Sequence, residues 1–202
     1  MPTHPVQRFY RYQAGVYDLT RWMFLYGRQR AIDLLEIQRD SRVLEIGCGT
    51  GLNFEHIVKR LDPARGRLVG VDFSQHMLGR AARRVASRGY VNLTVVGADA
   101  ERLALNERFD AVLFAYSLSM IPDWQSALER ACGHLSPGGR MVVLDFGRFD
   151  RWGPLRRLAR GWLWLNHVET GRPYETKLAE LLTNLRVEAH LGGYYFVAAG
   201  RK

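Results

Sequence analysis

Short apolar runs and helix-like stretches alternate along most of the chain. The apolar runs occupy residues 42–46, 67–72, 92–99, 109–117 and 140–146. Helical patterns lie between them at residues 52–61, 74–88 and 124–135. Apolar runs of this length, separated by amphipathic helices, are typical of strands buried in a parallel sheet. The pattern therefore predicts an α/β fold in which successive strands end at one shared edge.

The two ends of the chain follow different patterns. Residues 185–191 and 194–200 alternate about Gly192 and Gly193, which predicts an antiparallel β-hairpin. The opening segment is instead dense in aromatic and arginine residues and reads as helical. Further helices are expected at about residues 5–15, 18–36 and 174–184.

Turn and capping residues mark several boundaries between these elements. Ser74 suits the N-cap of the helix at residues 74–88, and Gly89 suits its C-terminal stop. Asp123 can cap the helix that follows it. The Ser-Pro-Gly-Gly sequence at residues 136–139 predicts a turn before the last parallel strand.

Three glycines follow the first apolar run, at positions 47, 49 and 51. Glycine adopts positive φ at little cost and lets the backbone approach a ligand, while amides at the start of the next helix point toward that ligand. Two acids, Asp72 and Asp99, end the second and third apolar runs, so both are expected at the edge of the sheet that carries the glycines. This arrangement favours a nucleotide-like ligand; a glycine turn with unrelated surface acids is the alternative.

The length of 202 residues leaves room for one α/β domain. A dehydrogenase usually needs a second domain for its substrate, which argues against a dinucleotide motif. No apolar run reaches the length of a membrane span, and the first residues lack the apolar segment of a signal peptide. Cys48 and Cys132 are isolated and the six histidines are scattered, so we expect reduced thiols in the cytoplasm and no metal.

The spacing Glu45-x-Gly47-x-Gly49, together with Asp72 and Asp99, resembles class I S-adenosylmethionine-dependent methyltransferases. The resemblance covers residues 40–147 and extends to the terminal strand pair. It implies a Rossmann-like seven-stranded sheet, mostly parallel, with helices on both faces. It also implies S-adenosylmethionine as the cofactor and S-adenosylhomocysteine as its product. In that family the glycine turn lies under the methionine part, the second-strand acid holds the ribose, and the third-strand acid meets the adenine amino group. The cofactor-binding residues implied by the resemblance are Tyr17, Arg28, Glu45, Gly47, Cys48, Gly49, Asp72, Phe73, Met77, Asp99, Ala100, Ala115 and Tyr116.

Aromatic and arginine residues near the start of the chain are candidates for a lid, although such a segment can also simply pack on the sheet. Tyr12, Tyr17 and Arg28 could reach the cofactor carboxylate or the methyl acceptor. Arginine pairs with carboxylates in a bidentate way, and tyrosine faces suit cations. In the family, residues just after the fourth strand border the transferred methyl, which adds Tyr116 and Ser117. The catalytic candidates are Tyr12, Tyr17 and Tyr116.

The segment from Tyr12 to Arg28, with its Tyr17-Asp18-x-Thr20-Arg21 motif, is also similar to small bacterial lipid N-methyltransferases. The closest subfamily completes betaine-lipid synthesis from diacylglycerylhomoserine, and phosphatidylethanolamine N-methyltransferases are its relatives. The resemblance implies successive methylation of a lipid amino headgroup to a trimethylammonium product. Such a reaction needs the amine neutral and in line with the methyl group, so no dedicated general base is expected.

The net charge of +9 favours an anionic partner. Residues 150–166 place three tryptophans and four arginines among leucines, a composition suited to a lipid headgroup boundary. An amphipathic helix that covers the substrate cleft is the alternative. Basic and aromatic residues together also suit nucleic acid, but no RNA- or DNA-reading module accompanies them. We therefore expect a lipid substrate at an anionic membrane surface, with peripheral association at the inner face of the membrane.

These patterns form a single methyltransferase domain, residues 1–202. Its parts are a helical lid or substrate segment at 1–38, the cofactor-binding core at 40–147, a basic amphipathic insertion and helix at 148–184, and the terminal hairpin at 185–202. Three other functions remain open. They are a methyltransferase for a soluble or quinone-like molecule, an RNA or protein methyltransferase, and an inactive protein with the same fold that binds membranes or partners. The oligomeric state is not predicted.

Overall fold

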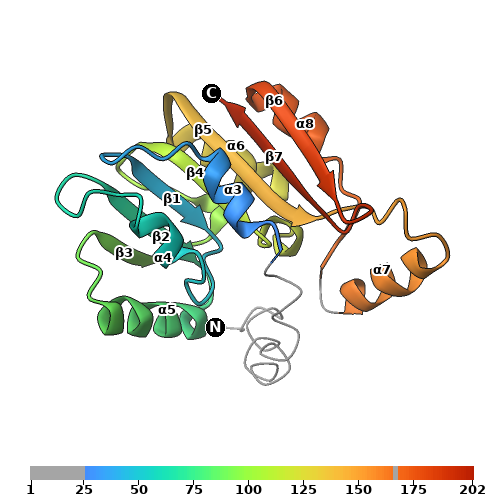
Figure 1. Cartoon of the computed structure of the whole chain (residues 1–202), viewed down its shortest axis with the longest axis horizontal. Helices are drawn as coiled ribbons and strands as arrows, with labels where there is room; N and C mark the ends of the chain where they lie inside the picture. Colours follow the sequence, from blue (N-terminus) through green and yellow to red (C-terminus); the bar gives the residue numbers. More distant parts are fainter. Residues whose placement is uncertain (1–25, 166–167) are drawn as a thin grey trace.

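A seven-stranded sheet forms the centre of the computed structural model, which describes residues 26–165 and 168–202 (Figure 1). The strands are β1 (Arg42–Ile46), β2 (Arg67–Asp72), β3 (Leu93–Gly97), β4 (Phe109–Ala115), β5 (Leu135–Phe146), β6 (Thr183–His190) and β7 (Tyr195–Arg201). Their order across the sheet is β3-β2-β1-β4-β5-β7-β6. The first five strands pair in parallel, and β7 runs antiparallel to both of its neighbours. The predicted fold class, including the terminal hairpin, is confirmed.

Helices cover both faces of this sheet. They are α3 (Arg28–Leu34), α4 (Phe54–Val58), α5 (Gln75–Arg88), α6 (Trp124–His134) and α8 (Tyr174–Leu181). The first three bury side chains in one apolar cluster, and α6 and α8 bury theirs in another. Because side chains alternate along a strand, Val43 of β1 enters the first cluster and Leu44 the second. The core is therefore two layers separated by the sheet.

One further helix, α7 (Leu155–Leu165), lies beyond the end of β5 rather than over a face of the sheet (Figure 1). Leu163 is its only buried residue. The helix falls inside the basic, tryptophan-rich segment singled out in the sequence. No helix in the described part of the chain has the length and apolar character needed to cross a bilayer.

The capping residues of α5 and α6 act as predicted. The Ser74 side chain accepts a hydrogen bond from the Met77 amide at 3.4 Å, and Gly89 ends α5 in the left-handed conformation. Asp123 accepts a bond from the Ser126 amide at 3.1 Å. Each side chain replaces a partner that the first turn of a helix lacks, which is why these boundaries were readable from the sequence.

The predicted turn at residues 136–139 is wrong, because β5 runs through it from Leu135. The Gly138 amide donates to the Lys202 carbonyl, and the Lys202 amide donates to the Gly139 carbonyl, so the segment stays bonded to the last residue of the chain. Gly138 takes a positive φ of 74°, and the register against β4 shifts between Phe109 and Ala111. The Pro-Gly-Gly sequence therefore bends the strand instead of ending it.

Several other expected boundaries shift. The helix predicted at residues 52–61 is reduced to the five residues of α4, because its C-terminal bonds tighten: the Leu61 amide donates to the Val58 carbonyl. β3 ends at Gly97, so Asp99 lies two residues beyond the strand rather than at its end. The helix predicted to end at residue 184 stops at Leu181, because the chain there has already joined β6.

At the start of the described part, Gly27 is the N-cap of α3, which lies within the helix predicted at residues 18–36. Gly27 adopts a φ of 74°, and a Cβ atom there would lie 2.6 Å from the ring of Tyr195. A residue with a side chain does not fit at position 27, because its Cβ would overlap the Tyr195 ring and its φ would be positive. α3 consequently begins at Arg28, while the helix predicted at 5–15 and the first part of 18–36 lie outside the described residues.

Candidate active site

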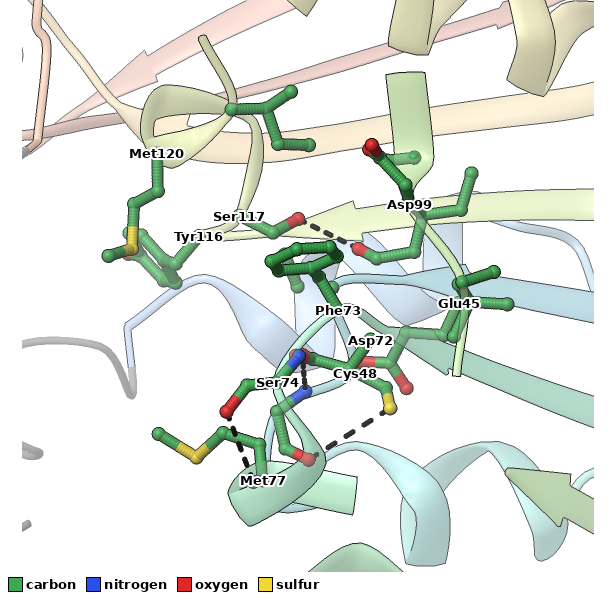
Figure 2. A pocket seen from close by; sticks show the side chains of 18 of the residues that line it. Glu45, Cys48, Asp72, Phe73, Ser74, Met77, Asp99, Tyr116, Ser117 and Met120 are labelled. Atoms are coloured by element: carbon green, nitrogen blue, oxygen red, sulfur yellow. Dashed lines mark hydrogen bonds between the residues drawn. The ribbon is translucent and has the colours of Figure 1, made fainter. Parts of the chain in front are cut away.

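A pocket of about 270 Å³ opens at the carboxyl ends of the parallel strands (Figure 2). The side chains around it come from the ends of β1, β2 and β4 and from the segment after β3. The structure brings together the predicted cofactor residues Arg28, Glu45, Gly47, Cys48, Gly49, Asp72, Phe73, Met77, Asp99, Ala100, Ala115 and Tyr116. Tyr12 and Tyr17 lie outside the described residues. Ser117, expected beside Tyr116, also lines the pocket.

The glycine turn, residues 47–51, is bonded to the end of β2. The Gly47 and Cys48 amides both donate to the Val71 carbonyl, at 2.8 and 2.9 Å. Gly47 and Gly49 have φ values of 71° and 56°, a region that favours glycine. A Cβ atom on Gly47 would lie 2.3 Å from the Cβ of Ser117, whereas one on Gly49 would meet no atom within 4 Å. Gly47 is therefore required by packing, and Gly49 leaves its side of the turn open.

Gly51 plays a different part from the one its spacing suggests. It has a φ of 76°, but a Cβ atom there would lie 2.4 Å from the ring of Phe54. It does not line the pocket. The third glycine of the motif thus allows α4 to pack closely rather than letting the backbone approach a ligand.

Asp72 is bonded through one carboxylate oxygen to the glycine turn and through the other to Ser74 at the start of α5. Its Oδ2 accepts from the Gly49 amide and its Oδ1 accepts from the Ser74 amide, both at 2.8 Å. Burial raises the pKa of Asp72, and the amide bonds oppose that shift because they stabilise the ionised form. Each oxygen has further lone pairs, so a carboxylate fixed this way can still accept hydrogen bonds from hydroxyl groups in the pocket.

Glu45 is fully buried at the floor of the pocket, and one of its oxygens has no hydrogen-bond partner among the described residues. Its Oε1 accepts from Asn53 Nδ2 at 2.6 Å, and Asn53 Oδ1 in turn accepts from Arg28 Nη1 at 2.8 Å. No hydrogen bond to Oε2 is found among the described residues. Burial raises the pKa of Glu45 to about 7, although the Asn53 bond and the Arg28 charge act in the opposite direction. When Glu45 is ionised, its buried and unpartnered Oε2 can accept a hydrogen bond from a cation such as an ammonium group.

Asp99 reaches the pocket from the short 3₁₀ helix η2 (Ala100–Arg102), which it caps. Its Oδ1 accepts from the Glu101 amide at 3.0 Å. Phe73 and Met77 also line the pocket, and Phe73 leaves 44% of its surface exposed there while Met77 is buried. An acid beside an exposed aromatic ring can hold a flat heterocycle that carries a hydrogen-bond donor.

Tyr116 is held in a constrained conformation at the end of β4. It has a φ of 56°, which is uncommon for a residue other than glycine. Its hydroxyl donates to the Tyr26 carbonyl at 2.9 Å, and its ring packs 5.0 Å from that of Phe146. Burial raises the pKa of Tyr116 well above its ordinary value, so the hydroxyl stays protonated and does not serve as a base. The catalytic role expected for Tyr116 stays a prediction.

Sequence reasoning missed Asn53 and the short wall formed by Met120, Ile121 and Pro122. Asn53 is fully buried between apolar neighbours, and it links Glu45 to Arg28. A lone polar residue on the apolar side of a helix just after the glycines was the available signal. The wall follows the 3₁₀ helix η3 (Leu118–Met120) and lines the pocket, but nothing in its sequence pattern marked it.

Metal-binding clusters are not part of the described chain: it contains no group of three or more histidine, cysteine or acidic side chains placed to hold an ion. Burial raises the pKa of the Cys48 thiol well above its usual range, so it remains a thiol beside the pocket.

Comparison with known proteins identifies the core of this arrangement. Residues 43–139 match the family model described as a methyltransferase domain. A demethylmenaquinone methyltransferase of Thermus thermophilus is 36% identical over 138 residues, which cover 64% of this chain and 60% of the relative. Another, from Shouchella clausii, is 24% identical over 199 residues, which cover 87% of this chain and 84% of the relative. A ubiquinone/menaquinone biosynthesis C-methyltransferase of Edwardsiella ictaluri is 32% identical over 67% of this chain. The chain spans only 60% and 56% of the lengths of the Thermus and Edwardsiella relatives.

Solved structures share the fold at low sequence identity. A phosphoethanolamine N-methyltransferase of Haemonchus contortus has a TM-score of 0.80 at 17% identity, covering 98% of this chain and 61% of that one. The N-methyltransferase NodS of Bradyrhizobium japonicum, in complex with S-adenosylhomocysteine, has a TM-score of 0.70 at 23% identity and covers 97% of each chain. The reported sequence relatives carry names of quinone methyltransferases, so they do not support the expected diacylglycerylhomoserine subfamily.

Proposed function

From the premise that this chain is a class I S-adenosylmethionine-dependent methyltransferase, as its fold and its methyltransferase domain indicate, we propose that it methylates a lipophilic small molecule. The observation that carries the cofactor part of the proposal is the pairing of two carboxylates in one pocket beside an open glycine turn, whereas the lipophilic acceptor is supported by the names of the sequence relatives. Glu45 and Asp72 both line it, and Gly49 leaves room for a ligand against the backbone. This arrangement suits a ligand with a cationic end and a hydroxyl-bearing ring.

The residues of the pocket fit the parts of S-adenosylmethionine. We assign the unsatisfied Oε2 of Glu45 to the amino group and the fixed carboxylate of Asp72 to the ribose hydroxyls. Phe73 and Met77 offer apolar surface to the adenine, and Asp99 offers an acceptor to its amino group. When bound, S-adenosylmethionine supplies an electrophilic methyl group on a sulfonium. The chain itself contributes position and the exclusion of water, which supply most of the rate in such transfers.

A quinone-type ring is the first candidate acceptor. The proposal is supported by relatives named as quinone methyltransferases, one of which aligns with 87% of this chain. A ring carbon becomes nucleophilic when a neighbouring hydroxyl loses its proton, so this reaction needs a base near the acceptor. The described pocket lining contains no histidine or lysine, and its acids are Glu45, Asp72, Asp99 and Glu101.

The amino headgroup of a membrane lipid is the second candidate, and that same lining favours it. A neutral amine attacks through its own lone pair and needs no base in the transfer step. Of the acids in the lining, Glu45, Asp72 and Asp99 are assigned to the cofactor, and Glu101 accepts from the Asp123 amide at 2.9 Å. The Tyr116 hydroxyl stays protonated. The candidate lipids are diacylglycerylhomoserine and phosphatidylethanolamine, because the opening segment of the sequence resembles N-methyltransferases that act on them.

One competition assay separates these acceptors. The protein is incubated with methyl-labelled S-adenosylmethionine and vesicles that contain a demethylated quinol, diacylglycerylhomoserine or phosphatidylethanolamine. Mass spectrometry of the extracted lipids then locates the label on carbon or nitrogen. Labelled quinol supports the first candidate, and labelled headgroup supports the second. Binding of S-adenosylhomocysteine without label in any lipid would refute a lipophilic acceptor and favour a soluble one.

A further inference from the structure

We propose that α7 is a docking surface for an anionic lipid bilayer and that it holds the mouth of the pocket at the membrane. The surface, here called the α7 face, is the exposed surface of this helix: Leu155, Leu158 and Leu165 lie along one side, and Trp164, Arg156 and Arg157 lie around the helix from them. The proposal deepens the proposed function, because a lipophilic acceptor resides in a membrane. The binding of the α7 face to lipid can nevertheless be tested without any acceptor.

The apolar half of the α7 face is unusually exposed. Five of the ten large apolar side chains that the described chain exposes lie on this one helix of 11 residues. Leu158, Trp164 and Leu165 leave 72%, 69% and 67% of their surface accessible. Leu155 and Leu158 are three residues apart, and Leu158 and Leu165 seven apart, so these leucines share a side of the helix. A concentration of this kind marks an interaction site rather than ordinary surface.

The charged half of the α7 face has one sign. Residues 148–165 contain five arginines and a single acid, Asp150. Arg156 and Arg157 are exposed, and neither has an acidic partner among the described residues. Arg160 is not counted in the α7 face, because its side chain already has a partner within the protein: its Nε donates to Thr170 Oγ1 at 3.2 Å. Two unpaired guanidinium groups next to exposed leucine and tryptophan match phosphate groups above acyl chains.

The root of α7 is fixed to the pocket through a chain of aromatic rings. Trp152 stacks on Tyr194 at 6.0 Å between centroids, and its Nε1 donates to the Leu191 carbonyl at 3.0 Å. Tyr194 packs 5.7 Å from Phe146, and Phe146 packs 5.0 Å from Tyr116 in the pocket wall. The segment that carries α7 also leaves the sheet at the end of β5, the edge where the pocket opens. A bilayer bound by α7 therefore meets the side of the molecule that contains the pocket.

Among possible occupants of the α7 face, a bilayer fits the two kinds of side chain together. A second copy of this chain would bring the same arginines against each other, because a two-fold interface pairs a patch with itself. RNA would satisfy Arg156 and Arg157 but would leave the exposed leucines in water. An anionic bilayer satisfies both at once, with the helix lying in the interface plane.

Vesicle flotation of the full chain tests the α7 face. Vesicles of phosphatidylcholine with phosphatidylglycerol are compared with vesicles of phosphatidylcholine alone. Wild-type protein is expected to float with the anionic vesicles. Replacing Arg156 and Arg157 by Glu is expected to weaken that binding at least about 25-fold, because each basic residue near such a surface contributes about fivefold. Salt on the order of 0.5 M screens surface charges beyond a few ångströms, so binding that survives it depends on the apolar side chains. The double variant Leu158→Gln with Leu165→Gln is expected to remove this salt-resistant binding.

The matched control replaces Arg83 and Arg130 by Glu. Both are exposed and lie on α5 and α6, so the net charge changes by the same amount far from α7. It is expected to float like wild type. Equal flotation of wild type and R156E/R157E, loss of flotation in the control, or preferential binding of RNA would each overturn the proposal. So would concentration-dependent dimers that R156E/R157E abolishes.

A separate measurement keeps this test apart from the proposed function. S-adenosylhomocysteine binding of R156E/R157E, measured by calorimetry, is expected to equal that of wild type. If wild type floats but labels neither a demethylated quinol, diacylglycerylhomoserine nor phosphatidylethanolamine when these are added to the anionic vesicles, the proposed acceptors fail and the docking surface stands. If a detergent-dispersed acceptor is methylated while flotation is absent, the docking surface fails and the activity stands.

Discussion

At the scale of single residues, the carboxylate of Asp72 acts on both the backbone and the ligand site. It accepts from the Gly49 and Ser74 amides and still faces the pocket. Asp72→Ala is expected to weaken S-adenosylhomocysteine binding by about 100-fold or more, since hydrogen bonds to a charged group contribute about 1.5–3 kcal/mol each. Calorimetry measures the affinity. Asp72→Asn, which keeps the size of the side chain, serves for comparison, and near-normal affinity in the alanine variant would refute the assignment.

Glu45 makes the binding of S-adenosylmethionine depend on pH. Its pKa is raised to about 7 in the ligand-free protein, and only the ionised form suits an ammonium group. As the pH falls below about 7, binding must first remove a proton from Glu45, so the affinity is expected to drop about tenfold per unit. Glu45→Gln should bind weakly and without this dependence. A wild-type affinity that stays constant between pH 8 and pH 6 would show that Glu45 does not meet the amino group.

Glu45 also links pH to the stability of the ligand-free protein. The folded pKa of about 7 exceeds the ordinary value of 4.5, so between these values the folded state holds a proton that the unfolded state has lost. The contribution of Glu45 to the free energy of unfolding therefore falls as the pH rises through this window. A ligand that pairs with Glu45 removes this cost.

At the scale of elements, the glycine turn separates packing from ligand access. Gly47→Ala places a Cβ atom against Ser117 and forces a left-handed alanine, so it is expected to cost about 3 kcal/mol of stability. Gly49→Ala is expected to reduce stability by only about 1–2 kcal/mol, the cost of a left-handed alanine, because its Cβ meets no atom. Its main effect should be weaker binding, since the new methyl group enters the space left for the ligand.

Urea unfolding and calorimetry on the two glycine variants check this contrast. Gly79→Ala on α5 is a suitable control, because Gly79 has an ordinary φ and open space around its Cβ position. It should leave binding near wild type and should not reduce stability, since alanine in a helix interior is about 0.5–1 kcal/mol more favourable than glycine. Equal loss of stability in Gly47→Ala and Gly49→Ala would contradict the distinction drawn between them.

The boundary of an element can be predicted from sequence when residues at that boundary determine it, and not when contacts with distant residues do. Ser74, Gly89 and Asp123 decide helix ends through their own side chains or φ angles, and these were predicted correctly. The bonds that keep residues 136–139 in β5 are made with Lys202, which lies 63 residues after Gly139. The lack of room for a side chain at Gly27 is set by the ring of Tyr195. Contacts of this kind between distant residues carry no local pattern, so the turn at 136–139 was wrongly predicted and the start of α3 at Arg28 was not predicted.

At the scale of the whole molecule, the pocket is lined by residues from several strands of the sheet. Its lining comes from α3, from the ends of β1, β2 and β4, and from the segments after β3 and β4. A ligand there is expected to raise the melting temperature by about 5–10 °C at 100 times its dissociation constant, because such binding adds about 2.7 kcal/mol. Differential scanning fluorimetry with S-adenosylhomocysteine measures this. Adenosine at the same concentration lacks the group meant for Glu45 and should therefore give a smaller shift, whereas an equal shift would argue against that pairing.

The cofactor half of the site was readable from sequence, whereas the acceptor half was not. Glycines and acids at strand ends are tied to one edge of the sheet by the topology, so their convergence follows once the strands are recognised. The acceptor side depends on Tyr12 and Tyr17, which lie outside the described residues, and on the wall around Met120. The lipid headgroup expected from the opening segment therefore remains a proposal beside the quinone ring.

The bonds between Lys202 and β5 have a practical use. The Lys202 backbone bonds to Gly138 and Gly139 near the start of β5, and its Nζ donates to the carbonyls of Cys132, on α6, and Leu135, the first residue of β5. The pocket opens at the opposite ends of the parallel strands. A tether attached at position 202 would thus leave the protein from the pole opposite the ligand mouth. Molecules immobilised on a sensor chip in this way would present that mouth to the flowing sample in one uniform orientation.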